Sequence, residues 1–241
     1  MKVSIIIPVY NEERTIGEIL DRVWAVDLGD IEREVVIVDD GSSDATRASI
    51  AANQHTRAGR VQVHQNPVNL GKGAAVRLGL SVATGDVLLV QDADLEFDPQ
   101  EHGRLLQPIL EGRADIVYGS RFLDRASELS RKSRLANRFL TSLTNVLFWS
   151  KLTDMETAHK VFRREVLDDV RLRCVGFDFE PEVTAKLLLA GHRIVEVPIS
   201  YKARSIEEGK KLRWTDGLDA VYTLIKCRVT GSGNRKRPVR G

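Results

Sequence analysis

A repeated alternation of short apolar runs with longer amphipathic segments constrains the fold of this chain more than any other feature. Residues 3–9 form an apolar, β-branched run that is typical of a strand buried on both faces of a sheet. Comparable runs follow at 34–38, 61–64, 86–91 and 116–118. Helical spacing fills the segments at about 12–26 and 69–84. The alternation predicts an α/β fold, with a mostly parallel central sheet and helices on both faces.

The second half of the chain predicts fewer strands and longer helices. Apolar residues at helical spacing indicate helices at about 135–149, at 182–190 and from Trp214 onward, with a strand at 194–197 between the last two. In the last helix the apolar stripe predicts core packing for Trp214, Leu218, Val221 and Ile225, with Tyr222 on the same face. A length of 241 residues fits one large domain, which we place at 1–230.

The charge distribution separates a basic end from the rest of the chain. The net charge is +2, but the last eleven residues, 231–241, carry four basic residues and no acid, so the remainder has a net charge of −2. We therefore expect a disordered basic tail on a body that does not bind nucleic acid. No run of 18 apolar residues predicts a membrane span, and two cysteines without CxxC spacing favour a reducing, cytoplasmic compartment.

Acidic residues gather where three of the predicted strands end. Glu12 follows the first strand, Asp39 and Asp40 follow the second, and Asp92, Asp94 and Glu96 follow the fourth. Ligands of open α/β sheets bind at this edge, and closely spaced carboxylates repel one another unless a cation offsets their charge. Mg²⁺ is commonly held by one or two carboxylates together with phosphate oxygens. The pattern therefore predicts a shared site that holds a divalent metal ion.

The first strand ends differently from a dinucleotide-binding fold. It runs into Pro8, Tyr10 and Glu12 without any GxGxxG motif, which counts against a dehydrogenase. A tyrosine at this position can stack on a base, and a carboxylate can accept hydrogen bonds from a base or ribose. The alternative is structural, since a glutamate also favours the start of the following helix.

The order of these motifs resembles the GT-A fold inverting glycosyltransferases of family 2. The motifs that carry the resemblance are IIIPVYNE (5–12), VDDGSSD (38–44), NLGKGAA (69–75) and DADLE (92–96). Five later motifs look like the dolichyl-phosphate mannose synthase branch of that family: GSR (119–121), DMET (154–157), KVF (160–162), FDFE (177–180) and GKK (209–211). The resemblance covers about residues 2–228.

The resemblance implies a role for particular residues of this chain. The nucleotide sugar would be bound by Pro8, Tyr10, Glu12, Val38, Asp40, Asp92, Ala93, Asp94, Arg121, Arg204 and Lys210, the last two at its phosphates. Asp94 and Glu96 would ligate Mg²⁺ or Mn²⁺, and Asp92, Asp94 and Arg121 form the expected catalytic set. The family often carries glutamine where this chain has Glu96, and the role of His159 is open.

The acceptor divides the remaining hypotheses. A lipid monophosphate is already anionic, whereas a hydroxyl acceptor needs a general base, for which Asp154 or Glu156 would serve. Helix capping or solvation is an equal alternative for those two acids. A basic stretch before and within the 135–149 helix suits a membrane surface: Arg131, Lys132 and Arg134 would grip a lipid phosphate, and Phe139, Leu143, Leu147 and Trp149 would face acyl chains or, equally, pack into the core.

We therefore expect an inverting, metal-dependent enzyme that moves a hexose from a nucleotide diphosphate sugar to a polyprenyl or dolichyl phosphate. GDP-mannose is the first choice of donor and UDP-glucose the second, and the enzyme would attach peripherally to the cytoplasmic membrane face. A soluble hydroxyl acceptor and a non-catalytic sugar-nucleotide-binding subunit stay as alternatives. A nucleotidyltransferase does not fit, since its GxGxR loop is missing after the first strand.

Overall fold

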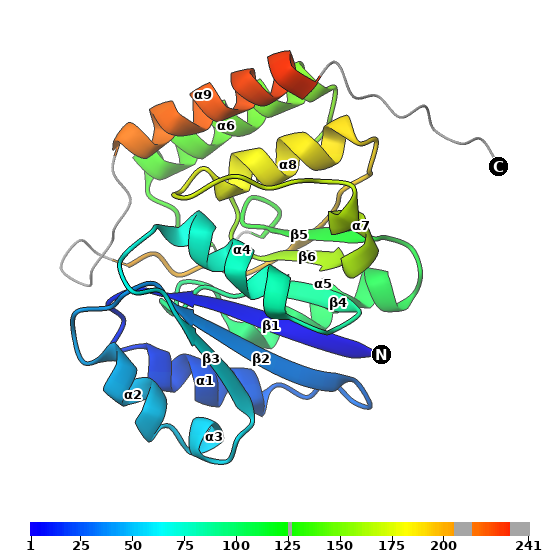
Figure 1. Cartoon of the computed structure of the whole chain (residues 1–241). Coiled ribbons are helices and arrows are strands. Elements are labelled where there is room, and N and C mark those ends of the chain that lie inside the picture. The colour runs from blue at the N-terminus through cyan, green and yellow to red at the C-terminus, as the bar shows by residue number, and fades with distance from the viewer. Residues whose placement is uncertain (125–126, 205–213, 232–241) are drawn as a thin grey trace.

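The computed structural model describes residues 1–124, 127–204 and 214–231, and its centre is one seven-stranded sheet. The strands lie in the order β3-β2-β1-β4-β6-β5-β7 (Figure 1). Their bounds are β1 Lys2–Val9, β2 Glu32–Asp39, β3 Val61–Gln65, β4 Val87–Val90, β5 Ile116–Ser120, β6 Lys160–Arg163 and β7 Val195–Pro198. All pairs are parallel except those of β6, which is antiparallel to both β4 and β5.

Alternate residues of the central strands face two different helical layers. Ile5 and Ile7 of β1 belong to a core that also contains α1 (Ile16–Ala25) and α5 (His102–Leu110). Ile6 faces the opposite way and packs with α4 (Lys72–Val82). Helix α8 (Phe179–Leu189) covers β5 and β6 on the α4 side. The prediction of a mostly parallel sheet with helices on both faces is therefore confirmed.

Short helices complete the two layers. They are α2 (Thr46–Ala52), α3 (Gln54–Arg57), the 3₁₀ turn η1 (Pro99–Glu101) and α7 (Arg164–Asp168). The sequence pattern does not predict these four elements, nor α5 and β6. Strand β6 is only four residues long and begins with the fully buried Lys160, whose ammonium donates to the carbonyl oxygens of Met155 and Thr157. A strand that opens on a buried cation does not match a hydrophobic pattern.

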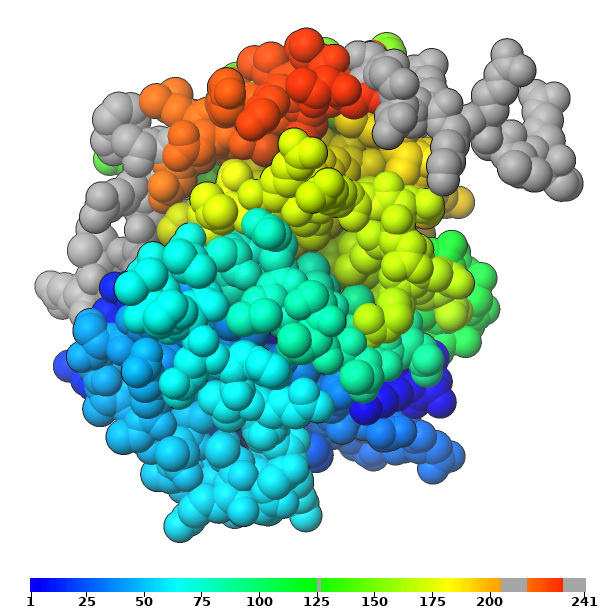
Figure 2. Space-filling model, viewed as in Figure 1, coloured from blue at the N-terminus to red at the C-terminus, as the bar shows by residue number. Residues whose placement is uncertain are grey.

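Two long helices, α6 (Arg131–Phe148) and α9 (Trp214–Gly231), pack against each other outside α8 (Figure 1). They share a core with α8 that includes Leu140, Phe148, Ala220 and Leu224. The Arg228 guanidinium lies 4.4 Å from the centre of the Trp149 ring and joins the two helices at one end. Figure 2 shows α9, in orange and red, on the outside of the molecule.

The expected core stripe of α9 is largely wrong. Leu218, Tyr222 and Ile225 are exposed, and only Val221 packs partly against the core. The helix instead buries Ala220, Leu224 and Cys227, because this side of α9 faces α6 and α8. The side chain of Trp214 lies outside the described part of the chain. No helix within the described residues is long and apolar enough to cross a bilayer.

Candidate functional site

The carboxyl ends of β1, β2 and β4 meet at one edge of the sheet. Val9 of β1 pairs with Asp39 of β2, and Ile6 of β1 pairs with Val90 of β4. The loops that follow therefore start side by side, and they carry the predicted polar residues. Pro8 and Tyr10 are partly buried at the start of the first loop. This arrangement is the one that the acidic strand ends predict.

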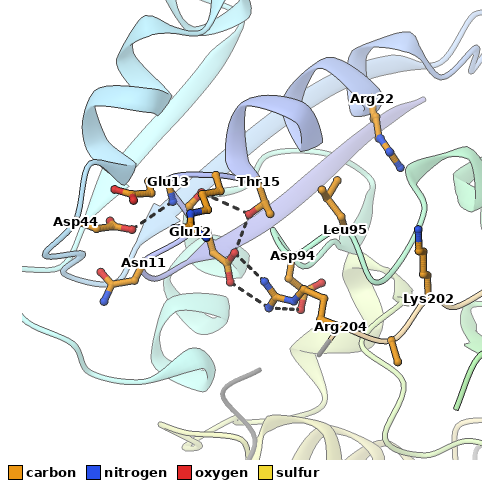
Figure 3. Close-up of a pocket in the computed structure, with 12 residues that line it drawn as sticks. Asn11, Glu12, Glu13, Thr15, Arg22, Asp44, Asp94, Leu95, Lys202 and Arg204 are labelled. Carbon is orange, nitrogen blue, oxygen red and sulfur yellow. Dashed lines mark hydrogen bonds and ion pairs between the residues drawn. The ribbon is translucent and has the colours of Figure 1, made fainter. Parts of the chain in front are cut away.

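The loop after β1 is fixed on the loop after β2. Asn11 has a φ of 50°, which is uncommon for a residue other than glycine. Its backbone N–H donates to Ser42 Oγ at 3.0 Å, and the backbone N–H of Glu12 donates to Thr46 Oγ1 at 2.8 Å. The hydroxyl of Thr15 donates to Glu12 Oε2 at 2.7 Å. The backbone carbonyl of Glu12 accepts from the N–H groups of Thr15 and Ile16 at the start of α1, while its carboxylate faces a pocket (Figure 3).

The adjacent acids after β2 are held by the protein itself. Arg47 Nε lies 2.6 Å from Asp39 Oδ2, and the N–H of Ser42 donates to Asp39 Oδ1. Asp40 accepts from Asn66 and from the backbone N–H groups of Leu70 and Gly71. Gly71 has a φ of 101°, a conformation that favours glycine. The Asp40 carboxylate therefore holds the 66–71 loop. The family resemblance implied instead that Asp40 contacts the nucleotide.

Two other residues of the predicted nucleotide site turn their side chains into the core. Val38 is fully buried against α4, and Ala93 is 3% exposed in the core beneath α1. Only the backbone of these two positions is therefore available to a ligand. Lys210, the predicted phosphate contact, lies outside the described residues.

The acidic loop after β4 holds three carboxylates with three different environments. Lys72, the first residue of α4, places its ammonium 2.9 Å from Asp92 and 2.9 Å from Glu180. Asp94 Oδ2 lies 3.2 Å from Arg204, and Glu96 accepts from the Tyr201 hydroxyl at 2.7 Å and from the Arg204 N–H at 2.9 Å. The loop also places Leu95 at a φ of 62°, so its backbone is strained.

Negative charge is concentrated at Asp94. Burial, followed by the charges of Asp92 and Glu96, raises the pKa of Asp94 to about 7 against the opposing effect of Arg204. At Lys72 burial lowers the pKa, but the carboxylates of Asp92 and Glu180 outweigh it and the net pKa is raised. Positive charge from the protein therefore compensates the carboxylate of Asp92 well, but that of Asp94 only in part.

The buried side chains of Gln91, His102 and His159 form a hydrogen-bonded group next to the acidic loop. The amide of Gln91 donates to the carbonyl oxygens of Asp92 (2.9 Å) and Phe97 (3.1 Å). Its own oxygen lies 2.8 Å from His102 Nε2 and 2.9 Å from His159 Nε2. Burial, assisted by the charge of Lys72, lowers the pKa of His159 to about 3, and burial also lowers that of His102. His159 is therefore a neutral hydrogen-bonding group within the protein, which answers a role that the sequence left open.

Arg121 makes its strongest contacts with the protein. Its Nε and Nη2 lie 2.7 and 2.8 Å from the two oxygens of Asp154, which is fully buried, and its backbone N–H donates to the same carboxylate. The guanidinium also lies 5.2 Å from the centre of the Tyr201 ring. Asp154 is thus paired with Arg121. The other predicted base is Glu156, whose surroundings shift its pKa. Burial and then the charge of Glu180 raise the pKa of Glu156 to about 8.

A pocket of about 470 Å³ opens between the loops after β1 and β4. Glu12, Asp94 and Arg204 line it together, although they lie up to 192 positions apart in the sequence (Figure 3). Arg204 comes from the segment that follows β7, and its guanidinium joins the two acids. The structure thus brings three of the predicted ligand-binding residues to one cavity. Lys72, Glu180, Gln91 and Tyr201 are contacts of this site that the sequence reasoning did not assign, although Lys72 and Glu180 lie within quoted motifs.

A family model for glycosyl transferase family 2 matches residues 4–171, which is more than half of the chain. The chain belongs to glycosyl transferase family 2. It is therefore a glycosyltransferase, and the resemblance that the sequence motifs carry is confirmed.

A curated relative agrees with this membership over nearly the whole chain. The chain is 30% identical over 232 residues to the undecaprenyl-phosphate 4-deoxy-4-formamido-L-arabinose transferase of Salmonella paratyphi A, covering 95% of this chain and 68% of that protein. The Salmonella dublin protein of the same name gives the same values. The motifs after residue 171 are thus included in the similarity.

Solved structures of other glycosyltransferases confirm the GT-A fold. Mannosyl-3-phosphoglycerate synthase of Rubrobacter xylanophilus superposes with a TM-score of 0.75 at 22% identity, over 100% of this chain and 78% of that one. Glucosyl-3-phosphoglycerate synthase of Mycobacterium tuberculosis, solved with Mn²⁺, UDP-glucose and phosphoglyceric acid, gives 0.70 at 21% identity, over 95% and 80%.

The acidic loop suits the divalent metal that the family fold implies. Its side chains offer hard carboxylate oxygens, and the raised pKa of Asp94 marks a place where a further cation would be stabilising. Within the described ranges, no three acidic, histidine or cysteine side chains are grouped closely enough to hold a metal ion alone. The carboxylate oxygens of the loop therefore fit a hard divalent cation such as Mg²⁺ or Mn²⁺.

Proposed function

We propose that this glycosyltransferase moves a hexose from a nucleotide diphosphate sugar to a polyprenyl phosphate, with inversion and with Mg²⁺ or Mn²⁺. GDP-mannose is the first choice of donor and UDP-glucose the second. The name of the curated relative, an undecaprenyl-phosphate sugar transferase, supports a lipid phosphate as the acceptor. The Mn²⁺ and UDP-glucose bound to the Mycobacterium tuberculosis structure support a metal and a nucleotide sugar.

The observation that carries the lipid acceptor is the outer face of α6 and α9. Eight large apolar side chains on these helices and at the end of α6 are 48–74% exposed: Leu135, Phe139, Val146, Trp149, Leu218, Tyr222, Ile225 and Val229. Helix α6 also carries four basic residues (Arg131, Lys132, Arg134 and Arg138) and no acid. We call this surface the α6–α9 face.

An exposed apolar surface with a basic border suits an anionic membrane. Of the residues expected to face acyl chains, Phe139 and Trp149 are 60% and 73% exposed, whereas Leu143 and Leu147 pack partly into the core. Two of these four residues therefore fit the membrane hypothesis, and the other two fit the core hypothesis. We propose that the α6–α9 face lies on the cytoplasmic surface of the membrane.

The residues of the site have distinct tasks in this reaction. Asp94 and Glu96 would hold the metal, whose positive charge would stabilise the diphosphate leaving group. Lys72 pairs with Asp92 and orients its carboxylate, and Gln91 holds the backbone of the acidic loop. Glu12 offers a carboxylate to the nucleotide. The ion pair with Asp154 fixes the Arg121 guanidinium next to the ring of Tyr201. A phosphate acceptor attacks the sugar carbon as an anion, so no general base is required.

A soluble hydroxyl acceptor is the second candidate, and Glu156 is the observation that favours it. A buried carboxyl group with a pKa of about 8 can exchange a proton near neutral pH, as a general base must. The two acceptors therefore make different demands on the same site. Transfer to 3-phosphoglycerate without lipid, and its loss in Glu156→Gln, would support the hydroxyl acceptor.

The proposal is tested by acceptor kinetics in variants of α6. The double variant Arg131→Gln/Arg134→Gln should raise the KM for polyprenyl phosphate about tenfold, because each arginine removed is a charge-assisted contact to phosphate or to anionic lipid. Donor affinity should not change. The matched control Arg57→Gln/Arg113→Gln removes the same charge elsewhere on the surface and should leave both constants unchanged. Weaker donor binding in the α6 variant would instead move those arginines to the donor site.

A further inference from the structure

Arg204 occupies both halves of the pocket at once. Its Nη1 lies 3.1 Å from Glu12 Oε2, and its Nη2 lies 3.3 Å from Glu12 Oε1 and 3.2 Å from Asp94 Oδ2. Figure 3 shows the guanidinium lying between these two carboxylates. Glu12 comes from the loop after β1, which the family resemblance assigns to the nucleotide, and Asp94 from the loop that suits a metal. Arg204 therefore pairs both with the acid expected to bind the nucleotide and with the acid expected to bind the metal.

The backbone around Arg204 is fastened to the acidic loop. The N–H of Arg204 donates to Glu96 Oε1 at 2.9 Å, and the hydroxyl of Tyr201 donates to Glu96 Oε2 at 2.7 Å. The N–H of Lys202 donates to the Glu96 carbonyl at 3.0 Å. Both oxygens of Glu96 therefore accept hydrogen bonds from the 201–204 segment. The guanidinium is delivered to Asp94 by the same segment that holds the second predicted metal ligand.

These charges are largely removed from water. The exposed fractions of the side chains are 13% for Arg204, 9% for Glu12 and 17% for Asp94. At such burial, solvent screens a charge weakly, and two cations on one carboxylate repel each other strongly. A divalent ion on Asp94 would therefore compete with the guanidinium. The donor diphosphate brings the negative charge that a displaced guanidinium needs as its next partner.

We propose that Arg204 is a built-in counter-cation that holds metal off Asp94 until the donor diphosphate arrives, and that it then transfers its contacts from Glu12 and Asp94 to that diphosphate. Metal and nucleotide consequently bind together, and neither binds well alone. The inference deepens the proposed function only in its donor half. It does not depend on which acceptor the enzyme uses.

The test measures binding without acceptor or turnover. Mn²⁺ is titrated by calorimetry or by its paramagnetic resonance signal into the wild type, Arg204→Gln and the control Arg113→Gln, first alone and then with GDP or with UDP. Arg113 lies outside the pocket, and its guanidinium pairs with Glu111. Its replacement removes the same charge without freeing Asp94.

The proposal predicts opposite changes in one variant. Arg204→Gln should bind Mn²⁺ alone about tenfold more tightly and bind the nucleoside diphosphate with Mn²⁺ about tenfold more weakly, so the coupling between the two is lost. Arg113→Gln should behave as the wild type. A merely structural arginine would weaken both equilibria, and that result, or unchanged Mn²⁺ affinity, would overturn the proposal.

A second variant covers the case in which Arg204→Gln does not fold. Arg204→Lys keeps the charge but cannot span both carboxylates as a planar guanidinium does. It should bind Mn²⁺ alone more tightly than the wild type, by a smaller factor. Equal or weaker Mn²⁺ binding in this variant would also contradict the proposal. Failure of lipid glycosylation with these binding results intact would overturn only the proposed acceptor.

Discussion

Lys72 and Asp92 form an ion pair at 2.9 Å, in which a lysine from the first turn of α4 reaches the acidic loop after β4. The same ammonium lies 2.9 Å from Glu180 at the start of α8. One cation thus joins three elements whose paired residues lie up to 108 positions apart in the sequence. All three side chains are at most 16% exposed, so the loss of the cation would leave two carboxylates with little solvation.

Replacement of this lysine should weaken both stability and transfer. We expect Lys72→Met to lower the free energy of unfolding by about 3 kcal/mol, because it leaves uncompensated buried charge. Transfer should fall because Asp92 is no longer oriented. Urea unfolding measures the first effect. The control Lys132→Met removes an exposed lysine of α6 and should change the unfolding free energy by less than about 0.5 kcal/mol. Equal stabilities of the two variants would refute the role of Lys72.

Asp94 should carry a trade-off between stability and function. Its pKa of about 7 lies above the ordinary 3.8, so in the protein without ligand it contributes stability at low pH that is lost as the pH rises towards 7. Asp94→Asn, which does not titrate, should therefore gain about 4 kcal/mol of stability relative to the wild type between pH 4 and pH 8. The same variant should lose transfer.

Two readouts check this trade-off. Urea unfolding at pH 4 and pH 8 gives the stability difference between Asp94→Asn and the wild type. Mn²⁺ with a nucleoside diphosphate should raise the Tm of the wild type but not that of the variant. Full turnover by Asp94→Asn would remove Asp94 from the metal site.

The two buried histidines should make the protein sensitive to acid. The pKa of His159 is lowered to about 3 and that of His102 well below 6.5, so the stability that their neutral forms contribute is lost as the pH falls below 6.5. Between pH 7.5 and pH 5 the titration of His159 should cost about 2 kcal/mol, and that of His102 adds to the loss. His159→Phe, which keeps a ring against Phe97, should show a loss smaller by about that amount when urea unfolding is compared at the two pH values. An identical loss in both proteins would mean that His159 titrates normally.

The α6–α9 face should bind anionic membranes. We expect the double variant Phe139→Glu/Trp149→Glu to lose vesicle affinity by at least about tenfold, because two exposed apolar groups become charged. Co-sedimentation with phosphatidylglycerol vesicles measures this effect. The control Leu110→Glu/Val63→Glu changes two exposed apolar residues away from this face and should sediment like the wild type. Similar loss in both variants would show that the membrane contact is not specific to the α6–α9 face.

Most of the fold follows from local sequence patterns, and the exceptions have physical causes. The runs at 3–9 and 34–38 predict strands correctly because both faces of β1 and β2 are buried. Strand β6 is missed because Lys160 interrupts its pattern with a buried charge. The stripe of α9 predicts burial for Leu218 and Ile225, yet burial depends on which neighbours cover the helix, and periodicity does not contain that information.

The candidate site divides in the same way. Acids at strand ends locate it, because parallel strands bring their carboxyl ends together. The partners of those acids come from distant segments: Arg204 reaches Asp94 across 110 positions, and Tyr201 reaches Glu96 across 105. Likewise, the engagement of Asp40 with the 70–71 backbone and of Arg121 with Asp154 depends on tertiary geometry. Motif spacing therefore predicts where the chemistry lies better than it predicts which atoms are available to a ligand.

Transfer of radiolabelled sugar to polyprenyl phosphate tests the central claim most directly. The wild type is incubated with Mg²⁺ and the lipid, with GDP-mannose or UDP-glucose as the labelled donor, beside samples that contain EDTA or the Asp94→Asn variant. The account predicts label in the organic phase from one donor, and none with EDTA or with Asp94→Asn. Label that stays in the aqueous phase while donor is consumed in the presence of a soluble hydroxyl compound would contradict it.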